Sequence, residues 1–137
     1  MMGPYATVCL KSANILLVDD QPAVRSGLKM LFQLEAVDLS IDEAGTGVEA
    51  LSAARLNPPD LVIMDVEMPG IDGFAATEQL INAVPTCLII MLTIHDTPQL
   101  RSRALAAGAW AYIRKGRPEE VRDAFRQALG FIGAASA

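Results

Sequence analysis

Residues 60–73 read Asp60-Leu-Val-Ile-Met-Asp-Val-Glu-Met-Pro-Gly-Ile-Asp-Gly73. The apolar run at residues 61–64 predicts a buried strand that ends at Asp65. After a short loop that ends at Asp72, the segment at residues 73–80 has the spacing of a helix. A buried strand followed by a helix is the repeating unit of an α/β protein.

The same strand-helix unit recurs on both sides of this stretch. The expected strands cover residues 14–18, 37–44, 61–64, 88–92 and 110–113. The expected helices cover residues 22–32, 48–56, 73–80, 98–107 and 118–129, with Gly130 behind the last one. Because parallel strands need a crossover between them, strict alternation indicates a parallel sheet covered on both faces. We therefore expect an α/β, flavodoxin-like, doubly wound fold whose five strands lie in the order 2-1-3-4-5.

Length and composition limit the class of protein. The 137 residues suffice for one hydrophobic core, and 52% apolar with 20% charged residues is typical of a globular protein. We expect an N-terminal extension at residues 1–13, one domain at residues 14–130, and a tail or linker start at residues 131–137. Cys9 and Cys87 fit neither a metal site nor a disulfide framework, which favours a cytoplasmic location.

The charge and hydropathy patterns argue against a membrane protein and against a nucleic-acid-binding protein. No apolar run is long enough to span a bilayer, so we expect no membrane partner. The net charge of −5 argues against direct nucleic-acid binding by this chain.

Polar side chains follow four of the five expected strands. Asp19 and Asp20 come after the first strand, Asp65 ends the third, Thr93 ends the fourth, and Lys115 follows the fifth. In doubly wound sheets ligands bind beyond the carboxyl ends of the strands, where these side chains would meet. Three clustered carboxylates repel one another unless a cation lies among them, and carboxylate oxygens suit Mg²⁺.

The combination of residue types suits phosphoryl transfer. A carboxylate such as Asp65 can act as a nucleophile, and a hydroxyl and an ammonium group can bind the phosphoryl oxygens. Taken singly, each residue has an ordinary structural interpretation: a turn for the acidic pair, a cap for Asp65 or Thr93, and a solvated charge for Lys115. Their occurrence together, each at a strand end, favours the functional interpretation.

From about Ile15 to Leu129 the chain resembles a response-regulator receiver domain of two-component signalling. The motifs that carry the resemblance are Ile15-Leu-Leu-Val-Asp-Asp20, Glu43-Ala-Gly-Thr-Gly-Val-Glu-Ala-Leu51, Asp60 to Gly73 as quoted above, Leu92-Thr-Ile-His-Asp96 and Ala107-Gly-Ala-Trp-Ala-Tyr-Ile-Arg-Lys115. The segment at residues 93–96 and the absence of proline after Lys115 resemble the NarL/FixJ branch.

The resemblance implies a role for each residue at the strand ends. Asp65 is the expected acceptor of a phosphoryl group from a sensor histidine kinase or a phosphotransfer protein. Asp20 and Asp65 are expected to bind Mg²⁺ directly, and Asp19 is expected to support it through water. The backbone carbonyl of Glu67 would complete the protein ligands. Thr93 and Lys115 are the remaining two site residues, expected to bind the phosphoryl oxygens.

The resemblance also implies how the signal leaves the site. Thr93 would move toward the phosphate and let Tyr112 turn inward, which alters the surface of the fourth helix, fifth strand and fifth helix. This surface would bind a partner or a second copy of the chain. Without the resemblance, Tyr112 is an ordinary core residue of an amphipathic strand. Receivers of this kind are signalling domains, not turnover enzymes, although slow self-dephosphorylation is possible.

The sequence departs from the common pattern at several positions. Gly116 replaces the usual proline after Lys115, so we expect a trans or a strained peptide bond there. Ile94 replaces a small residue, and we expect its branched side chain to narrow access to the acceptor. We expect Glu67, Ile94 and His95 together to set the lifetime of the phosphorylated state, although an exposed loop histidine is the simpler interpretation of His95.

Trp110 is a candidate interface residue on the fifth strand. Alternation with Tyr112 makes its partial exposure plausible, and an exposed tryptophan among basic side chains would suit an acidic or self-complementary partner. The basic residues expected near it are Arg101, Arg103, Arg114 and Arg117.

Other functions are compatible with parts of the pattern. A Mg²⁺-dependent phosphohydrolase of the haloacid-dehalogenase kind also uses an aspartyl phosphate, but its nucleophile follows the first strand. A pseudo-receiver that only mediates protein contacts would not need the intact set of site residues. The chain is either a stand-alone receiver or part of a longer transcriptional regulator whose missing C-terminal domain would bind DNA, and we favour the second.

Overall fold

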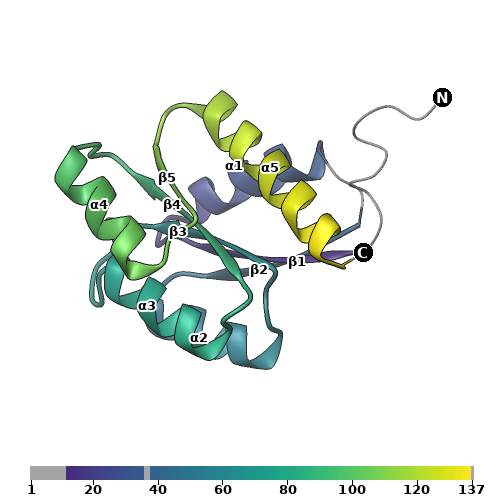
Figure 1. The fold of residues 1–137 in the computed structure, drawn as a ribbon, viewed down its shortest axis with the longest axis horizontal. Helices are drawn as coiled ribbons and strands as arrows, with labels where there is room; N and C mark the ends of the chain where they lie inside the picture. Colours follow the sequence, from purple (N-terminus) through teal and green to yellow (C-terminus); the bar gives the residue numbers. More distant parts are fainter. Residues whose placement is uncertain (1–11, 36–37, 137) are drawn as a thin grey trace.

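The computed structural model describes residues 12–35 and 38–136, which alternate between five strands and five helices (Figure 1). The strands are β1 (Ala13–Val18), β2 (Leu39–Ala44), β3 (Leu61–Asp65), β4 (Leu88–Thr93) and β5 (Ala111–Arg114). The helices are α1 (Pro22–Gln33), α2 (Gly47–Leu56), α3 (Gly73–Ala83), α4 (Pro98–Ala107) and α5 (Pro118–Ser136). The first eleven residues of the predicted extension, Cys9 among them, and Val37 of the predicted second strand lie outside the described residues.

The strands form one parallel sheet in the predicted order β2-β1-β3-β4-β5. The order reverses between β1 and β3, which are neighbours in the sheet. Because all strands run the same way, their carboxyl ends meet at one edge, with Asp65 opposite Leu92 and Thr93 opposite Arg114. The register therefore brings the polar residues that follow β1, β3, β4 and β5 to the same side of the molecule.

Two apolar clusters hold helices on the two faces of the sheet. One joins the sheet to α2, α3 and α4, and the other joins it to α1 and α5, as the two layers in Figure 1 show. Phe32 of α1 stacks on Phe125 of α5 with ring centroids 4.0 Å apart, and both side chains are fully buried. Burying an aromatic side chain contributes about 1.5–3 kcal/mol. This pair therefore fixes α5 against α1.

Side-chain caps determine where three helices begin. The predicted cap Thr46 accepts a hydrogen bond from the Glu49 amide at the start of α2, and Glu49 in turn accepts one from the Gly45 amide. Asp72 caps α3, and Thr97 caps α4. Each cap satisfies an N–H group that the first helical turn leaves unpaired.

The last helix is longer than predicted. We expected it to end at about Leu129, but α5 continues through Gly130 to Ser136. Glycine in a helix interior costs about 1 kcal/mol relative to alanine. Ile132 packs against the α1/α5 cluster, and this burial offsets the cost. Residues 131–136, predicted as a tail or linker start, therefore continue the helix.

Within the described residues, no helix is both long enough and apolar enough to cross a bilayer.

Candidate functional site

Three carboxylates cluster at the carboxyl edge of the sheet, as predicted. Asp19 and Asp20 follow β1, and Asp65 ends β3; one oxygen from each lies within 4.8 Å of the others. Asp19 and Asp65 are each 2% exposed, whereas Asp20 is open to solvent. The topology creates this cluster because β1 and β3 are paired neighbours.

Lys115 reaches into the same cluster from the loop after β5. Its Nζ lies 2.7 Å from Asp65 Oδ1 and 3.5 Å from Asp19 Oδ2. The Lys115 amide donates to the Thr93 carbonyl at 2.7 Å, which ties this loop to the end of β4. The peptide bond to Gly116 is trans and Gly116 has a φ of +87°, so the predicted trans bond is confirmed. A left-handed φ favours glycine, because other L-residues are strained there.

Burial raises the pKa of the Asp65 carboxyl from 3.8 to about 6. The hydrogen bond from Lys115 lowers this pKa and the charge of Asp19 raises it, but desolvation is the largest cause. Burial also opposes the charged form of Lys115. The hydrogen bond and the charge of Asp65 outweigh that effect and raise the pKa of Lys115. The two groups therefore form an ion pair that holds the Lys115 ammonium on the Asp65 carboxylate.

The residues present fit a divalent cation. Asp19 Oδ2 is buried and accepts no hydrogen bond from the described residues, although the Lys115 ammonium lies 3.5 Å away. A buried carboxylate oxygen without a hydrogen bond carries a large desolvation cost that a bound cation would offset. An all-oxygen set of this kind suits Mg²⁺, which keeps several waters.

Glu67 makes contacts that the sequence analysis missed. Its carboxylate accepts a hydrogen bond from the Thr93 hydroxyl at 2.7 Å and one from the Ile94 amide at 2.8 Å. Its own amide donates to Asp65 Oδ1 at 3.1 Å. The predicted strand order could have indicated this contact. Because the third and fourth strands are neighbours, a residue two positions after Asp65 lies close to Thr93.

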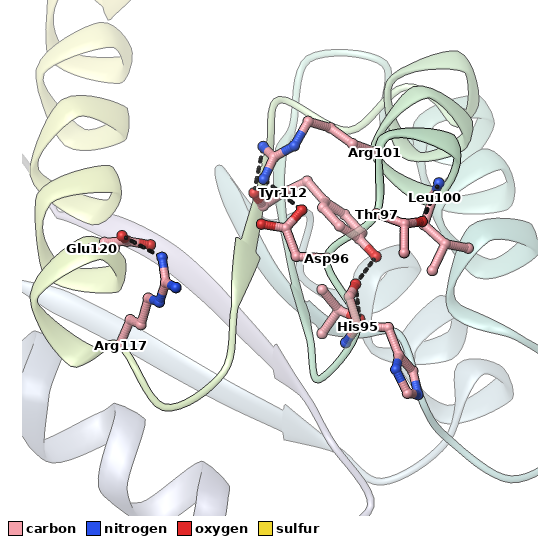
Figure 2. Close-up of polar contacts among 9 residues, drawn as sticks. His95, Asp96, Thr97, Leu100, Arg101, Tyr112, Arg117 and Glu120 are labelled. Atoms are coloured by element: carbon pink, nitrogen blue, oxygen red, sulfur yellow. Dashed lines mark hydrogen bonds and ion pairs between the residues drawn. The ribbon is translucent and has the colours of Figure 1, made fainter.

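A short relay of hydrogen bonds joins Thr93 to Tyr112 of β5. The His95 amide donates to Thr93 Oγ1 at 2.9 Å, and the Tyr112 hydroxyl donates to the His95 carbonyl at 2.7 Å. Figure 2 shows the Tyr112 ring reaching this carbonyl beneath Arg101. Arg101 donates to the Tyr112 carbonyl and pairs with Asp96. Tyr112 is therefore a buried residue held at both its ring and its backbone.

The β4–α4 loop carries two exposed residues directly after Thr93. Ile94 is 54% exposed, and His95 is also exposed. Figure 2 shows the His95 imidazole pointing away from the Tyr112 hydroxyl. His95 is therefore an exposed loop residue, as expected, and its effect on the phosphorylated state stays a prediction.

The predicted interface residues do not form one cluster around Trp110. Trp110 is partly buried as expected, but it packs with the α1/α5 cluster, whereas Tyr112 belongs to the other cluster. The prediction that Trp110 and Tyr112 alternate within one strand was wrong. Trp110 precedes β5, which begins at Ala111, so it is not part of the strand's pleat. Arg103 lies over the Phe74 ring, on the side of the sheet opposite to Trp110. Arg114 and Arg117 are both exposed, and Arg117 pairs with Glu120 (Figure 2).

Residues 15–126 match the response regulator receiver domain family. The chain is 38% identical to the response regulator UvrY of Escherichia coli over 115 residues, which cover 82% of this chain and 52% of UvrY. It is 37% identical to the response regulator GacA of Pseudomonas aeruginosa over 116 residues, which cover 83% of this chain and 54% of GacA. The chain thus spans about half the length of these curated relatives.

Solved structures of response regulators also resemble this chain. A two-component response regulator of the LuxR family from Aurantimonas matches with a TM-score of 0.80 at 32% identity, covering 88% of this chain and 86% of that chain. A CheY-like receiver domain protein from Methanospirillum hungatei matches with a TM-score of 0.82 at 25% identity, covering 91% and 99%. UvrY and GacA are regulators of the NarL/FixJ type, in agreement with the predicted branch.

Proposed function

The chain belongs to the response regulator receiver domain family of two-component signalling, and we propose that Asp65 is its phosphoryl acceptor. The observation that carries the proposal is the meeting of three carboxylates and Lys115 at one edge of the sheet. In the transfer, the phosphorus–nitrogen bond of a phosphohistidine on a sensor kinase or phosphotransfer protein breaks. A phosphorus–oxygen bond to Asp65 forms, and the histidine nitrogen keeps the electron pair. The setting we propose is the cytoplasm.

The acidic residues would hold Mg²⁺. Asp20 and Asp65 are the proposed direct ligands, with the backbone carbonyl of Glu67, and Asp19 supports the ion through water. When bound, Mg²⁺ neutralises charge that develops on the phosphoryl group. The buried Asp19 oxygen that accepts no hydrogen bond supports this assignment.

Two groups must exchange partners as the phosphoryl group arrives. Lys115 pairs with Asp65 and the Thr93 hydroxyl bonds Glu67 in the structure. Both are the proposed ligands of the phosphoryl oxygens. Transfer therefore requires the phosphoryl group to draw Lys115 off the acceptor and to displace the Glu67 carboxylate from Thr93.

Glu67 would also affect how long the phosphate persists. A carboxylate beside the Thr93 hydroxyl and the Ile94 amide competes for the donors that hold the phosphoryl oxygens. The exposed Ile94 side chain and His95 directly follow Thr93, so a phosphodonor or an attacking water would pass near them. We propose that these three residues together set the lifetime of the phosphorylated state, including any slow self-dephosphorylation.

The relay from Thr93 to Tyr112 is the proposed route to the surface. A change in the partners of Thr93 alters the position of the His95 backbone, which the Tyr112 hydroxyl contacts. The altered surface of α4, β5 and α5 would bind a partner or a second copy of the chain. We propose that this surface includes Arg101, Arg114 and Trp110. Arg103 would lie at its edge next to α3, because it contacts the Phe74 ring.

In a longer regulator this surface would control a DNA-binding domain and hence transcription. The relatives are about twice as long as the matched region, and they are named as response regulators. A stand-alone receiver and a phosphorylation-independent receiver are the alternatives.

Intact mass spectrometry after incubation with a small-molecule phosphodonor tests the proposal. We expect the mass of one phosphoryl group to appear on the wild-type protein with Mg²⁺, and to be lost when EDTA is present. The Asp65→Asn variant should stay unlabelled, whereas Asp38→Asn, which alters an exposed carboxylate outside the site, should label normally. An unlabelled wild-type protein would support the phosphorylation-independent alternative.

A further inference from the structure

Arg25 of α1 connects the acidic cluster to the end of β2. Its Nη1 donates to the backbone carbonyl of Asp19 at 2.5 Å, and its Nε donates to Glu43 Oε1 at 2.9 Å. The Arg25 side chain is 17% exposed; its bond to the Asp19 carbonyl is partly buried, whereas its bond to Glu43 is open to solvent. The planar guanidinium fixes the directions of both bonds, which a flexible ammonium would not.

The carbonyl that Arg25 holds belongs to the peptide bond between Asp19 and Asp20. The Asp20 carboxylate is exposed and makes no hydrogen bond or ion pair within the described part of the chain. Its direction therefore depends on the backbone that precedes it. The Asp19 amide donates to the Ala44 carbonyl of β2 at 3.1 Å, so a contact to β2 before Asp19 and the contact to Arg25 of α1 after it restrain the chain on both sides.

We propose that Arg25 is a positioning residue for the cation site, which orients Asp20 through the Asp19–Asp20 peptide. The inference rests on the proposed function, because it concerns the same site. Arg25 has two opposite effects on a divalent cation. Its positive charge beside the carboxylates repels the cation, whereas its hydrogen bonds place the ligands. Positioning is the larger effect.

The two effects predict opposite results for an Arg25→Gln variant. If charge dominated, removing it would tighten Mg²⁺ binding. Because positioning dominates, we expect the dissociation constant for Mg²⁺ to rise about five- to tenfold, which corresponds to about 1–1.4 kcal/mol, the contribution of one ordinary hydrogen bond. Arg25→Lys keeps the charge and loses the second directed bond, so we expect a smaller rise of about threefold.

Mg²⁺ titrations by calorimetry and by amide NMR shifts measure these constants. Arg55→Gln is the matched control, since it removes the same charge from an exposed position in the last turn of α2. Its constant should match that of the wild-type protein. The dispersion of the amide shifts shows whether each variant is folded. If Arg25→Gln does not fold, the Mg²⁺ dissociation constant of Arg25→Lys tests the inference instead.

Tighter or unchanged binding by folded Arg25→Gln would overturn the inference and leave the proposed function intact. If Arg25→Gln does not fold, unchanged binding by Arg25→Lys would overturn it. A wild-type protein that binds no Mg²⁺ would overturn both.

Discussion

The two halves of the site differ in the kind of interaction that holds them. On the side of β1 and β3, the site consists of charges: the acidic cluster and the Lys115 ammonium, with Asp65 at the centre. On the side of β4 and β5, it is a relay of hydrogen bonds that passes from Glu67 through Thr93 to Tyr112. The charged half is suited to bind a cation and react, and the relay is suited to respond. Glu67 belongs to both, because its amide bonds Asp65 and its carboxylate bonds Thr93.

The largest effect should come from removing the lysine of the charged half. Lys115→Gln removes a charge-assisted hydrogen bond to Asp65 and a proposed ligand of the phosphoryl oxygens. Such a bond contributes about 1.5–3 kcal/mol, so we expect phosphorylation by a small-molecule donor to slow by about 10- to 100-fold. Quench-flow or timed mass spectrometry measures this rate.

Arg117→Gln is the control for Lys115, because it removes the same charge two residues later from an exposed side chain. Its rate should stay within about twofold of the wild-type rate. Equal rates for wild type and Lys115→Gln would show that the lysine is only a structural partner of Asp65.

Asp65→Asn should stabilise the fold at neutral pH. The pKa of Asp65 is about 6 in the folded protein and 3.8 in an ordinary environment, so the folded state binds this proton more tightly than the unfolded chain. Stability therefore falls as pH rises from about 4 to 6 and stays lower above that range. At about 1.4 kcal/mol per pKa unit, we expect the free energy of unfolding of Asp65→Asn at pH 8 to exceed that of wild type by about 2–3 kcal/mol.

Urea denaturation without Mg²⁺ at a series of pH values measures this difference. It should shrink as pH falls and vanish below about pH 3, where Asp65 is protonated in both states. A difference that did not vary with pH would mean that the asparagine acts through packing, not through the charge of the buried carboxylate.

Most residues of the charged half could be predicted from the sequence, but fewer contacts of the relay could. The acidic pair, Asp65 and Lys115 each follow an apolar run, and the parallel topology brings them together whatever the details of packing. Glu67 was assigned only a backbone role and a general effect on lifetime, because its side-chain partners depend on the path of the loop after β3. The length of α5 was underestimated because a glycine that often ends a helix is tolerated when Ile132 beyond it is buried.

Glu67 tests whether the relay restrains the reaction. Glu67→Ala frees the Thr93 hydroxyl and the Ile94 amide, so phosphorylation should accelerate about three- to tenfold. Glu67→Gln removes the same charge but can still bond both groups, so its acceleration should be smaller. Timed mass spectrometry gives the rates, with Glu78→Ala on the exposed face of α3 as the control. Equal acceleration in both variants would assign the effect to charge alone.

The smallest effect should come from the far end of the relay. Tyr112→Phe removes the bond from the hydroxyl to the His95 carbonyl and keeps the buried ring. We expect a loss of about 1 kcal/mol in the free energy of unfolding, measured by urea denaturation, with the phosphorylation rate unchanged. A slower phosphorylation rate would show that the two halves are not separable.

The most direct test of the acceptor assignment is to locate the phosphoryl group itself. Borohydride reduces an aspartyl phosphate to homoserine, so reduction of the labelled protein followed by peptide mass spectrometry identifies the modified residue. We expect homoserine at position 65 and unmodified aspartate at positions 19 and 20. Homoserine at another position, or a phosphoryl group on His95, would contradict the account.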